Sequence, residues 1–312
     1  MAHASKMQGA EPSDAVSIYA FLSGSLKARW KRYRKKLKQC QRRFSEGAVH
    51  NSRIETRRLL SLIELLAAFL PSKDLNKARR ILKHHLDAFN DLRDTHVQLI
   101  FVGGMLRTFP AMRTFHAALV KHESRCARRT AKDVKQIKTT RLARLVRSLL
   151  SELRKKDRAS GSAGRAVGLE RATRSIHRAY AGVTLRLRRI DPADTATIHR
   201  TRIAFKRFRY MVEALASLLP GVSRERIEAM QEYQAMMGDI QDVEVLLAAL
   251  DKYLRKGKIS SAVGQRFRDE LLRRRQWLIE IYLSQANRLR EFWPLSQSAS
   301  AKATGKKGNK KK

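Results

Sequence analysis

Residues 49–71 read VHNSRIETRRLLSLIELLAAFLP, and residues 198–220 read IHRTRIAFKRFRYMVEALASLLP. The two stretches align without a gap, because each matched residue of the second lies 149 positions after its counterpart in the first. Both end on a proline, which cannot continue a helix. The cationic matches are His50 with His199, Arg53 with Arg202, Arg57 with Lys206, and Arg58 with Arg207. A repeat of this length predicts an internal duplication.

A helical wheel of about 100° per residue gives each stretch two faces. The cationic positions of each copy fall on or beside one face, and an apolar stripe runs along the opposite side. The stripe of the first copy is Leu59, Leu62, Ile63 and Leu66, and that of the second is Phe208, Met211, Val212 and Leu215. The pattern predicts two equivalent helices, each with its leucine-rich side in a core.

A second match follows the first in the same order. Residues 90–97, NDLRDTHV, align with residues 238–245, GDIQDVEV, at an offset of 148, and both run on into leucines. Two ordered matches at nearly one offset indicate that the halves of the chain share one helical plan.

Periodicity and helix breakers predict eight helices and no sheet, hence an all-α protein of two four-helix bundles. The expected helices cover residues 14–45, 48–70, 72–109, 111–155, 165–190, 194–219, 223–255 and 260–292. Ser72 and Ser223 are expected N-caps, and Gly103–Gly104 an expected kink or break. The expected divisions are a disordered N-terminus (1–13), a first unit (14–156), a linker reading DRASGSAGR (157–165), a second unit (166–293) and a disordered Lys-rich tail (294–312).

Charge restricts the classes of partner. The chain of 312 residues carries 67 Lys and Arg against 28 Asp and Glu, a formal net charge of +39, and its 43% hydrophobic content allows real cores. A folded body this positive repels itself and calls for an anionic partner such as nucleic acid, an anionic membrane or inorganic polyphosphate. With no apolar signal-peptide core and no apolar run long enough to span a bilayer, we expect a soluble, cytoplasmic protein.

The repeated cationic face suits a linear phosphate polymer. Cations at i, i+3 and i+7 stand one above another on a helix, so that they repel when alone and form a ladder of charge-assisted hydrogen bonds to a polyanion. Arginine can hold two phosphate oxygens, and histidine adds a donor that titrates near neutral pH. Two simpler interpretations are a solvated basic face and a core histidine. The same histidine in both copies, opposite the leucines, favours the ligand.

Signals for catalysis or metal binding are weak. The pairs Asp91/Asp94 and Asp239/Asp242 suit ion pairing with arginine better than acid–base work, and no nucleotide-binding, nucleophile-elbow or metalloprotease motif occurs. The histidine spacings, His84 beside His85 and His116 six residues before His122, do not match a metal site. Cys40 and Cys126 fit buried, reduced thiols. We therefore expect no enzyme activity, no metal and no cofactor.

At these residues the sequence resembles the CHAD domain family, the conserved histidine α-helical domain. The resemblance rests on the His-x-x-Arg-Ile-x-x-x-[Arg/Lys]-Arg stretch of each half, with LRDTHV and IQDVEV as support, and covers about residues 14–292. It implies two four-helix bundles related by pseudo-twofold symmetry around a basic channel or groove. It also implies non-enzymatic binding of inorganic polyphosphate, with possible association with polyphosphate granules. The residues implicated are His50, Arg53, Arg57, Arg58, His199, Arg202, Lys206 and Arg207.

The sequence departs from the family pattern in the second motif. His96 and Glu244 replace its second acidic residue, and Gln241 replaces the arginine that Arg93 keeps, so no ligand contact is assigned to these helices. The alternative function is a nucleic-acid-binding basic protein, although the basic faces offer few aromatic rings beside Tyr210 for stacking on bases. A phosphate-handling enzyme or histidine phosphoacceptor is a third possibility, supported by no acid–base pair or metal cluster.

Overall fold

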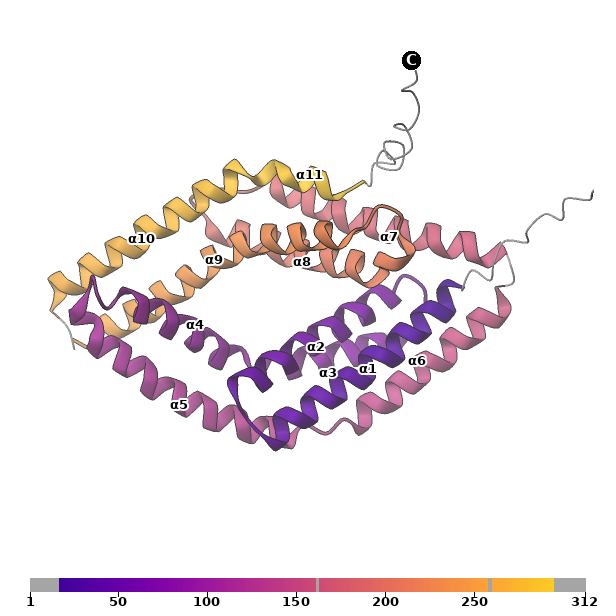
Figure 1. Ribbon diagram of the computed structural model, residues 1–312, viewed down its shortest axis with the longest axis horizontal. Helices are drawn as coiled ribbons and strands as arrows, with labels where there is room; N and C mark the ends of the chain where they lie inside the picture. The colour runs from indigo at the N-terminus through magenta and orange to yellow at the C-terminus, as the bar shows by residue number, and fades with distance from the viewer. Residues whose placement is uncertain (1–16, 161–162, 258–259, 295–312) are drawn as a thin grey trace, which may run out of the picture.

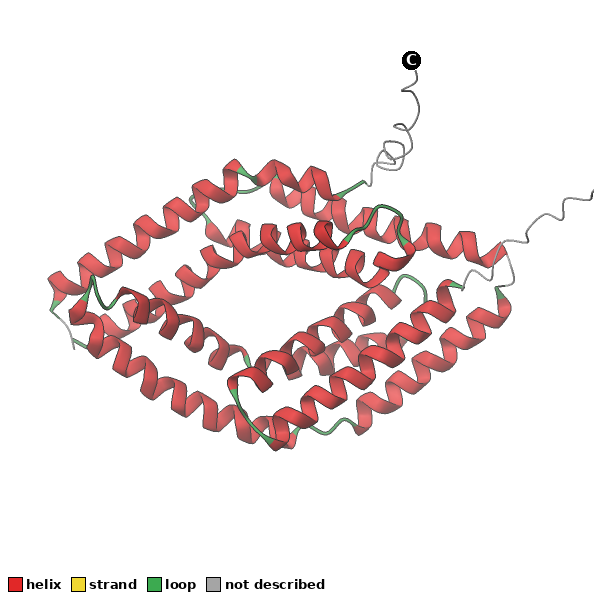
Figure 2. Ribbon diagram, viewed as in Figure 1, coloured by secondary structure: helices red, strands yellow, loops and turns green. Residues whose placement is uncertain are grey.

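The computed structural model describes residues 17–160, 163–257 and 260–294. Figure 2 shows helices joined by short loops, and no strand occurs in these ranges beyond an isolated bridge between Asp191 and Asp194. The all-α prediction is therefore confirmed. The expected disordered ends, 1–13 and 294–312, lie outside the described residues except for Pro294.

The helices of the first half outnumber the prediction. They are α1 (Ile18–Arg42), α2 (Glu46–Leu66), α3 (Lys73–Asp87), α4 (Asn90–Met105), α5 (Arg113–Gln136) and α6 (Thr140–Ala159). The second half contains α7 (Ala163–Leu187), α8 (Thr195–Leu215), α9 (Arg224–Leu254), α10 (Ser261–Ser284) and the short α11 (Leu289–Phe292).

Two expected long helices of the first half are each broken, which corrects the four-helix count for residues 14–156. The first break lies at Ala88–Phe89 and not at Gly103–Gly104, which remain inside α4. The second lies at residues 137–139, where the Gln41 side chain of α1 donates hydrogen bonds to the carbonyl oxygens of Val134 (3.0 Å) and Ile137 (3.1 Å). Tertiary contacts therefore override a continuous helical pattern.

The expected linker is also shorter than residues 157–165. Helix α6 runs through Ala159 and α7 starts at Ala163, because Ala and Arg in this stretch favour helix over loop. Two predicted caps are confirmed. The hydroxyl of Ser72 accepts from the Asp74 amide at the start of α3, and that of Ser223 accepts from the Arg226 amide at the start of α9.

Four helices of the first half form a bundle. Helix α1 packs against α2 and α6, and α3 packs against the same two helices, so that the four enclose a core. In the second half α7 packs on α8, α8 on α9, and α9 on α10. One apolar core runs through both groups, since α1 contacts α7 and α2 contacts α8. Helices α1 and α7 approach closely at Gly168, where a Cβ atom would lie 2.1 Å from Cγ2 of Ile18.

The α4–α5 pair leaves the first bundle and packs against α9 and α10 around a second, separate core. Aromatic pairs hold this contact. The rings of Phe115 and Tyr253 lie 4.9 Å apart, and those of Phe109 and Phe267 lie 5.2 Å apart. The molecule is thus closed at two places, by α2 against α8 and by the α4–α5 pair against α9–α10.

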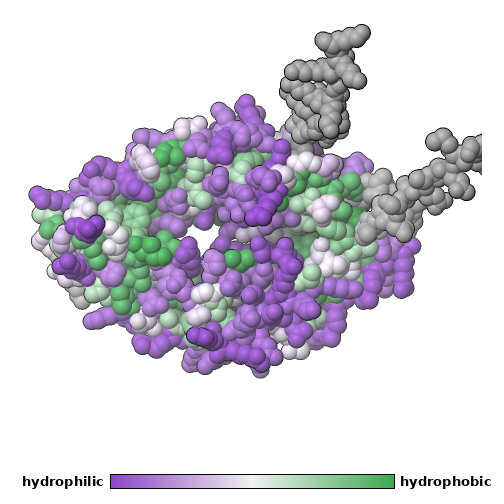
Figure 3. Space-filling model, in the orientation of Figure 1, coloured by the Kyte–Doolittle hydropathy of each residue, from purple (hydrophilic) through white to green (hydrophobic). Residues whose placement is uncertain are grey.

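These two closures leave an opening in the middle of an elongated ring. In Figure 1 the ribbons of α2, α4, α8 and α9 border it. The space-filling view in Figure 3 shows that it passes through the molecule, with hydrophilic residues gathered at its rim. Within the described residues, no helix combines the length and the apolar character that crossing a bilayer requires.

Candidate functional site

The two repeated helices are positioned by their apolar stripes. All eight stripe residues predicted from the wheel are at most 5% exposed, so α2 and α8 each bury the leucine-rich side. Ser45 caps α2 through the Ala48 amide, and Asp194 caps α8 through the Ala196 amide. Because α2 contacts α8, the cationic sides of the two copies are brought to one place in the fold.

Four cations from the two copies form what we name the central cationic cluster: Arg53 and Arg57 of α2, and Arg202 and Lys206 of α8. Burial, followed by the charges of Arg57, Arg202, Arg209 and Arg53, lowers the pKa of Lys206 to about 7. A lysine with its pKa so far below 10.5 is buried and has other cations as neighbours.

The first arginine of each copy contacts the second repeated motif of its own half. Arg53 is only 8% exposed, and its Nη1 donates to Oδ1 of Asn90 at the start of α4, 3.3 Å away. Arg202 packs over Gly238 of α9, where a Cβ atom would lie 3.4 Å from its Nη2. Asn90 and Gly238 are themselves matched positions of the second repeat, so the two repeated motifs meet in both halves.

Burial and neighbouring cations also lower the pKa of both arginines. Burial, Arg57 and Arg93 lower the pKa of Arg53 to about 10. Burial lowers the pKa of Arg202, Arg57 acts in the same direction, and Asp242 and Asp239 oppose it. The Nε atom of Arg202 is buried without a hydrogen-bond partner among the described residues. The guanidinium group of Arg202 thus has unused capacity to donate.

The two repeated histidines differ. His199 is half-buried, and burial followed by the charge of Arg202 lowers its pKa. Its Nδ1 is buried with no hydrogen-bond partner in the described part of the chain. His50 is exposed. The structure therefore brings His199 to the central cationic cluster, whereas His50 lies at a more open position on α2.

Acidic residues of α4 and α9 offset part of the charge. Asp94 lies close enough to Arg53, and Asp242 close enough to Arg93 and Arg202, for these cations to act on the carboxylates. Burial nevertheless raises the pKa of both, because protein surrounds them even where water reaches their tips. The prediction that the Asp pairs serve as partners of arginine agrees with this arrangement.

Arg58 belongs to a different place. Its guanidinium lies 3.0 Å from Glu55 and 4.0 Å from Glu213 of α8, in a cleft between α1, α2 and α8 that Arg29 also lines. Arg209, 6% exposed, completes this network through Glu213 at 3.1 Å. Arg58 thus takes part in an ion-pair network between the halves, and its expected contact with polyphosphate stays a prediction.

Arg207 is exposed and takes part in no ion pair within the described ranges. Sequence reasoning missed Arg93, whose charge acts on both Arg53 and Asp242. The signal was available, because Arg93 lies between two aspartates in a repeated motif. It also missed Arg29, since α1 carries no match to a repeated cationic motif.

Comparison with known proteins agrees with this architecture. The family model described as "CHAD domain" matches residues 25–251, which is most of the chain. The crystal structure of the CHAD domain from the plant Ricinus communis superimposes with a TM-score of 0.67. It is 19% identical in sequence, and the match covers 91% of this chain and 97% of the plant chain. A search of curated proteins finds no match. On the family match, supported by the shared fold, this chain belongs to the CHAD domain family.

Proposed function

We propose that this protein binds inorganic polyphosphate at the central cationic cluster, without chemical turnover. One observation carries the proposal: burial, together with cations of both repeats, lowers the pKa of Lys206 to about 7. This arrangement costs stability in the free protein, and a multivalent anion removes the cost. Membership of the CHAD domain family, for which the sequence resemblance implies polyphosphate binding, supports the choice of ligand.

A linear phosphate polymer fits the arrangement in charge and in spacing. The cations on α2 and on α8 repeat once per one or two helical turns, and a polyphosphate offers a negative charge at every unit. Release of the counterions condensed on the polymer adds to the affinity, as it does for nucleic acids. Two helices acting on one polymer bind more tightly than either helix alone.

Nucleic acid remains the alternative, and the rings near the site argue against it. Tyr210 lines the cleft beside Arg58, but the guanidinium of Arg209 lies over its ring at 4.3 Å. Trp277, half exposed, is similarly paired with Arg274 at 4.9 Å on the distant α10. A ring that is already covered offers less surface for stacking on bases. Polyphosphate has no bases to stack, so covered rings do not weaken its binding.

A competition measurement separates the two ligands. Polyphosphate should displace labelled DNA from the protein at a far lower charge-equivalent concentration than DNA needs to displace labelled polyphosphate. Equal displacement would show that the site binds any polyanion and has no preference for polyphosphate. Incubation with polyphosphate should release no inorganic phosphate, and steady release that depends on the protein would contradict binding without turnover.

Paired substitutions locate the site. The double variant Arg57→Gln/Lys206→Gln should lose most of the polyphosphate affinity and yet melt at a higher temperature, because it removes repulsion between the halves. The matched control, Arg224→Gln/Arg174→Gln, replaces two cations at exposed positions and should retain the affinity. If both pairs lower the affinity equally, overall charge and not the central cationic cluster holds the polymer.

The same variants test association with polyphosphate granules. A fluorescent fusion of the unchanged protein should concentrate at granules in cells that make polyphosphate, and the Arg57→Gln/Lys206→Gln fusion should not. A diffuse signal from the unchanged fusion would separate binding in solution from targeting in the cell.

A further inference from the structure

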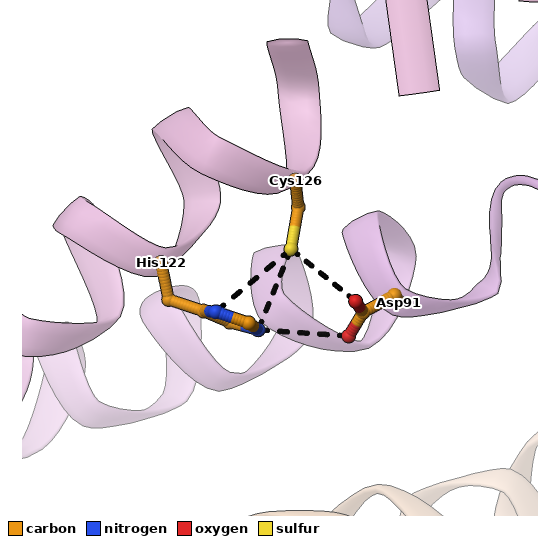
Figure 4. A group of neighbouring side chains, drawn as sticks. All are labelled: Asp91, His122 and Cys126. Atoms are coloured by element: carbon orange, nitrogen blue, oxygen red, sulfur yellow. Dashed lines mark hydrogen bonds and ion pairs between the residues drawn. The ribbon is translucent and has the colours of Figure 1, made fainter. Parts of the chain in front are cut away.

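Three side chains with metal-ligating atoms meet between α4 and α5, outside the central cationic cluster (Figure 4). Asp91 comes from the first turn of α4, and His122 and Cys126 come from α5. Their ligand atoms all lie within 4.8 Å of one another. We propose that these residues form a binding site for a thiophilic divalent cation, with Zn²⁺ as the best match.

The distances suit tetrahedral coordination. Nε2 of His122 lies 3.5 Å from Oδ1 of Asp91 and 3.4 Å from Sγ of Cys126, and Sγ lies 3.4 Å from Oδ2 of Asp91. Zinc bonds of about 2.0–2.3 Å at tetrahedral angles place ligand atoms about 3.3–3.6 Å apart. The three groups are therefore spaced as the ligands of a single ion are.

The backbone sets this geometry before any ion binds. His122 and Cys126 are spaced i, i+4, so one helical turn places both on the same face of α5, as in other helical zinc-binding pairs. Helix α4 packs along that face and brings Asp91 to it. The spacing between histidines does not indicate this site, because only one of its ligands is a histidine. Cys126 has no second cysteine near it in the sequence and so gives no metal-site pattern.

The ligand set selects the metal. A thiolate and an imidazole favour zinc and other late transition metals, whereas magnesium and calcium prefer sets made of oxygen atoms alone. Cys126 is 2% exposed, which shields the sulfur, while the side chains of His122 and Asp91 are 42% and 50% exposed. An ion can thus enter from solvent, and its fourth position would face water.

The charges of the two anionic ligands match the charge of the ion, although the chain as a whole is basic. Binding replaces the thiol proton of Cys126, which leaves to solvent, so that one thiolate and one carboxylate neutralise the dication. Arg129 pairs with Asp91 in the free protein. It can remain on one carboxylate oxygen while the other binds the ion, which is the usual supporting role of a neighbour to a ligating carboxylate.

Metal content tests the proposal directly. The full chain without an affinity tag is freed of polyanion in high salt, treated with a chelator, loaded with Zn²⁺ and desalted. Mass spectrometry should find one zinc per chain in the unchanged protein, and little in Cys126→Ser or His122→Gln. Cys40→Ser is the matched control, because Cys40 is equally buried but belongs to no such cluster among the described residues. Equal zinc in Cys40→Ser and Cys126→Ser would overturn the assignment, as would a metal-free unchanged protein.

Cobalt provides a spectroscopic check that a folding defect cannot imitate. Co²⁺ loaded in place of Zn²⁺ should show the sulfur-to-cobalt charge-transfer absorption of a bound thiolate, and Asp91→Asn should weaken cobalt binding about tenfold or more. Circular dichroism confirms that each variant keeps its helices. The Arg57→Gln/Lys206→Gln variant should bind metal normally, so failure of the metal site and failure of polyphosphate binding are distinguishable. A cobalt spectrum without the thiolate absorption would rule out Cys126 as a ligand.

Discussion

Lys206 shows most clearly how tertiary structure changes the chemistry of a single residue. Its match with Arg57 and its place on the cationic face of α8 could be predicted from the repeat. Its low pKa could not, because the shift arises first from burial, and because Arg57 and Arg53, which add to it, lie about 150 positions earlier in the chain. The same reason applies to Arg58. The wheel places it beside the cationic face, but its ion pair with Glu213 depends on how α2 packs against α8.

Polyphosphate binding should take up a proton above neutral pH. Free Lys206 loses its proton near pH 7, and a bound polyanion raises that pKa, so between pH 7 and about 9 binding restores the charge and the affinity falls as pH rises. Calorimetry in two buffers of different ionisation enthalpy measures the uptake. Lys206→Arg should bind without this uptake, since arginine stays charged throughout. An unchanged proton count in Lys206→Arg would assign the titration to another group.

Stability should respond to the same residue with a defined sign. In the folded state Lys206 deprotonates near pH 7, while in the unfolded state it stays protonated to about pH 10.4, so its charge destabilises the fold most at and below pH 7. Lys206→Met should therefore raise the melting temperature most at pH 6, with a gain that shrinks as pH approaches 10. A gain independent of pH would point to packing and not to charge.

At the scale of elements, the α3–α4 segment and helix α9 differ in continuity. Both follow the same repeated pattern, yet α9 runs unbroken from Arg224 to Leu254, whereas its counterpart breaks at Ala88–Phe89. Phe89 and Leu92 are each 1% exposed and pack in the first core, whereas Val102 further along α4 packs in the second. Helix existence could be predicted from periodicity, but the break depends on which core each side chain reaches.

The second break depends on one side chain. Gln41 donates to two carbonyl oxygens where α5 ends. That of Val134 also accepts from the Ile137 amide at 3.1 Å, so loss of the Gln41 amide affects chiefly the carbonyl of Ile137. Gln41→Ala should lower the free energy of unfolding by about 1–3 kcal/mol. The exposed Lys38→Ala on the same helix should change it by less than about 0.5 kcal/mol. Urea unfolding followed by circular dichroism measures both, and equal midpoints would show that water replaces the amide.

At the scale of the whole molecule, the ring is closed by one contact between the cationic repeats and another between aromatic residues of α4–α5 and α9–α10. The duplication and the helical class were readable in the sequence. The sharing of α4–α5 between the first half and the helices of the second was not, since no local pattern encodes a partner so distant in the chain.

Salt should have opposite effects on the free and the bound protein. The free protein, at +39, should melt at a higher temperature as salt screens its self-repulsion. The added stability from polyphosphate should shrink over the same range, because counterion release loses its advantage. Thermal melts from about 0.05 to 0.3 M salt, with and without polymer, test both trends. A polyphosphate effect that salt leaves unchanged would exclude an electrostatic mode of binding.

The opening seen in Figure 3 gives the ring a kinetic property. A polymer threaded through a closed ring can leave only by sliding until one of its ends passes through. Residence time would then lengthen with the number of phosphate units, even when the affinity per unit is constant. A cyclic phosphate has no end to thread, so it can touch only the rim and should exchange rapidly.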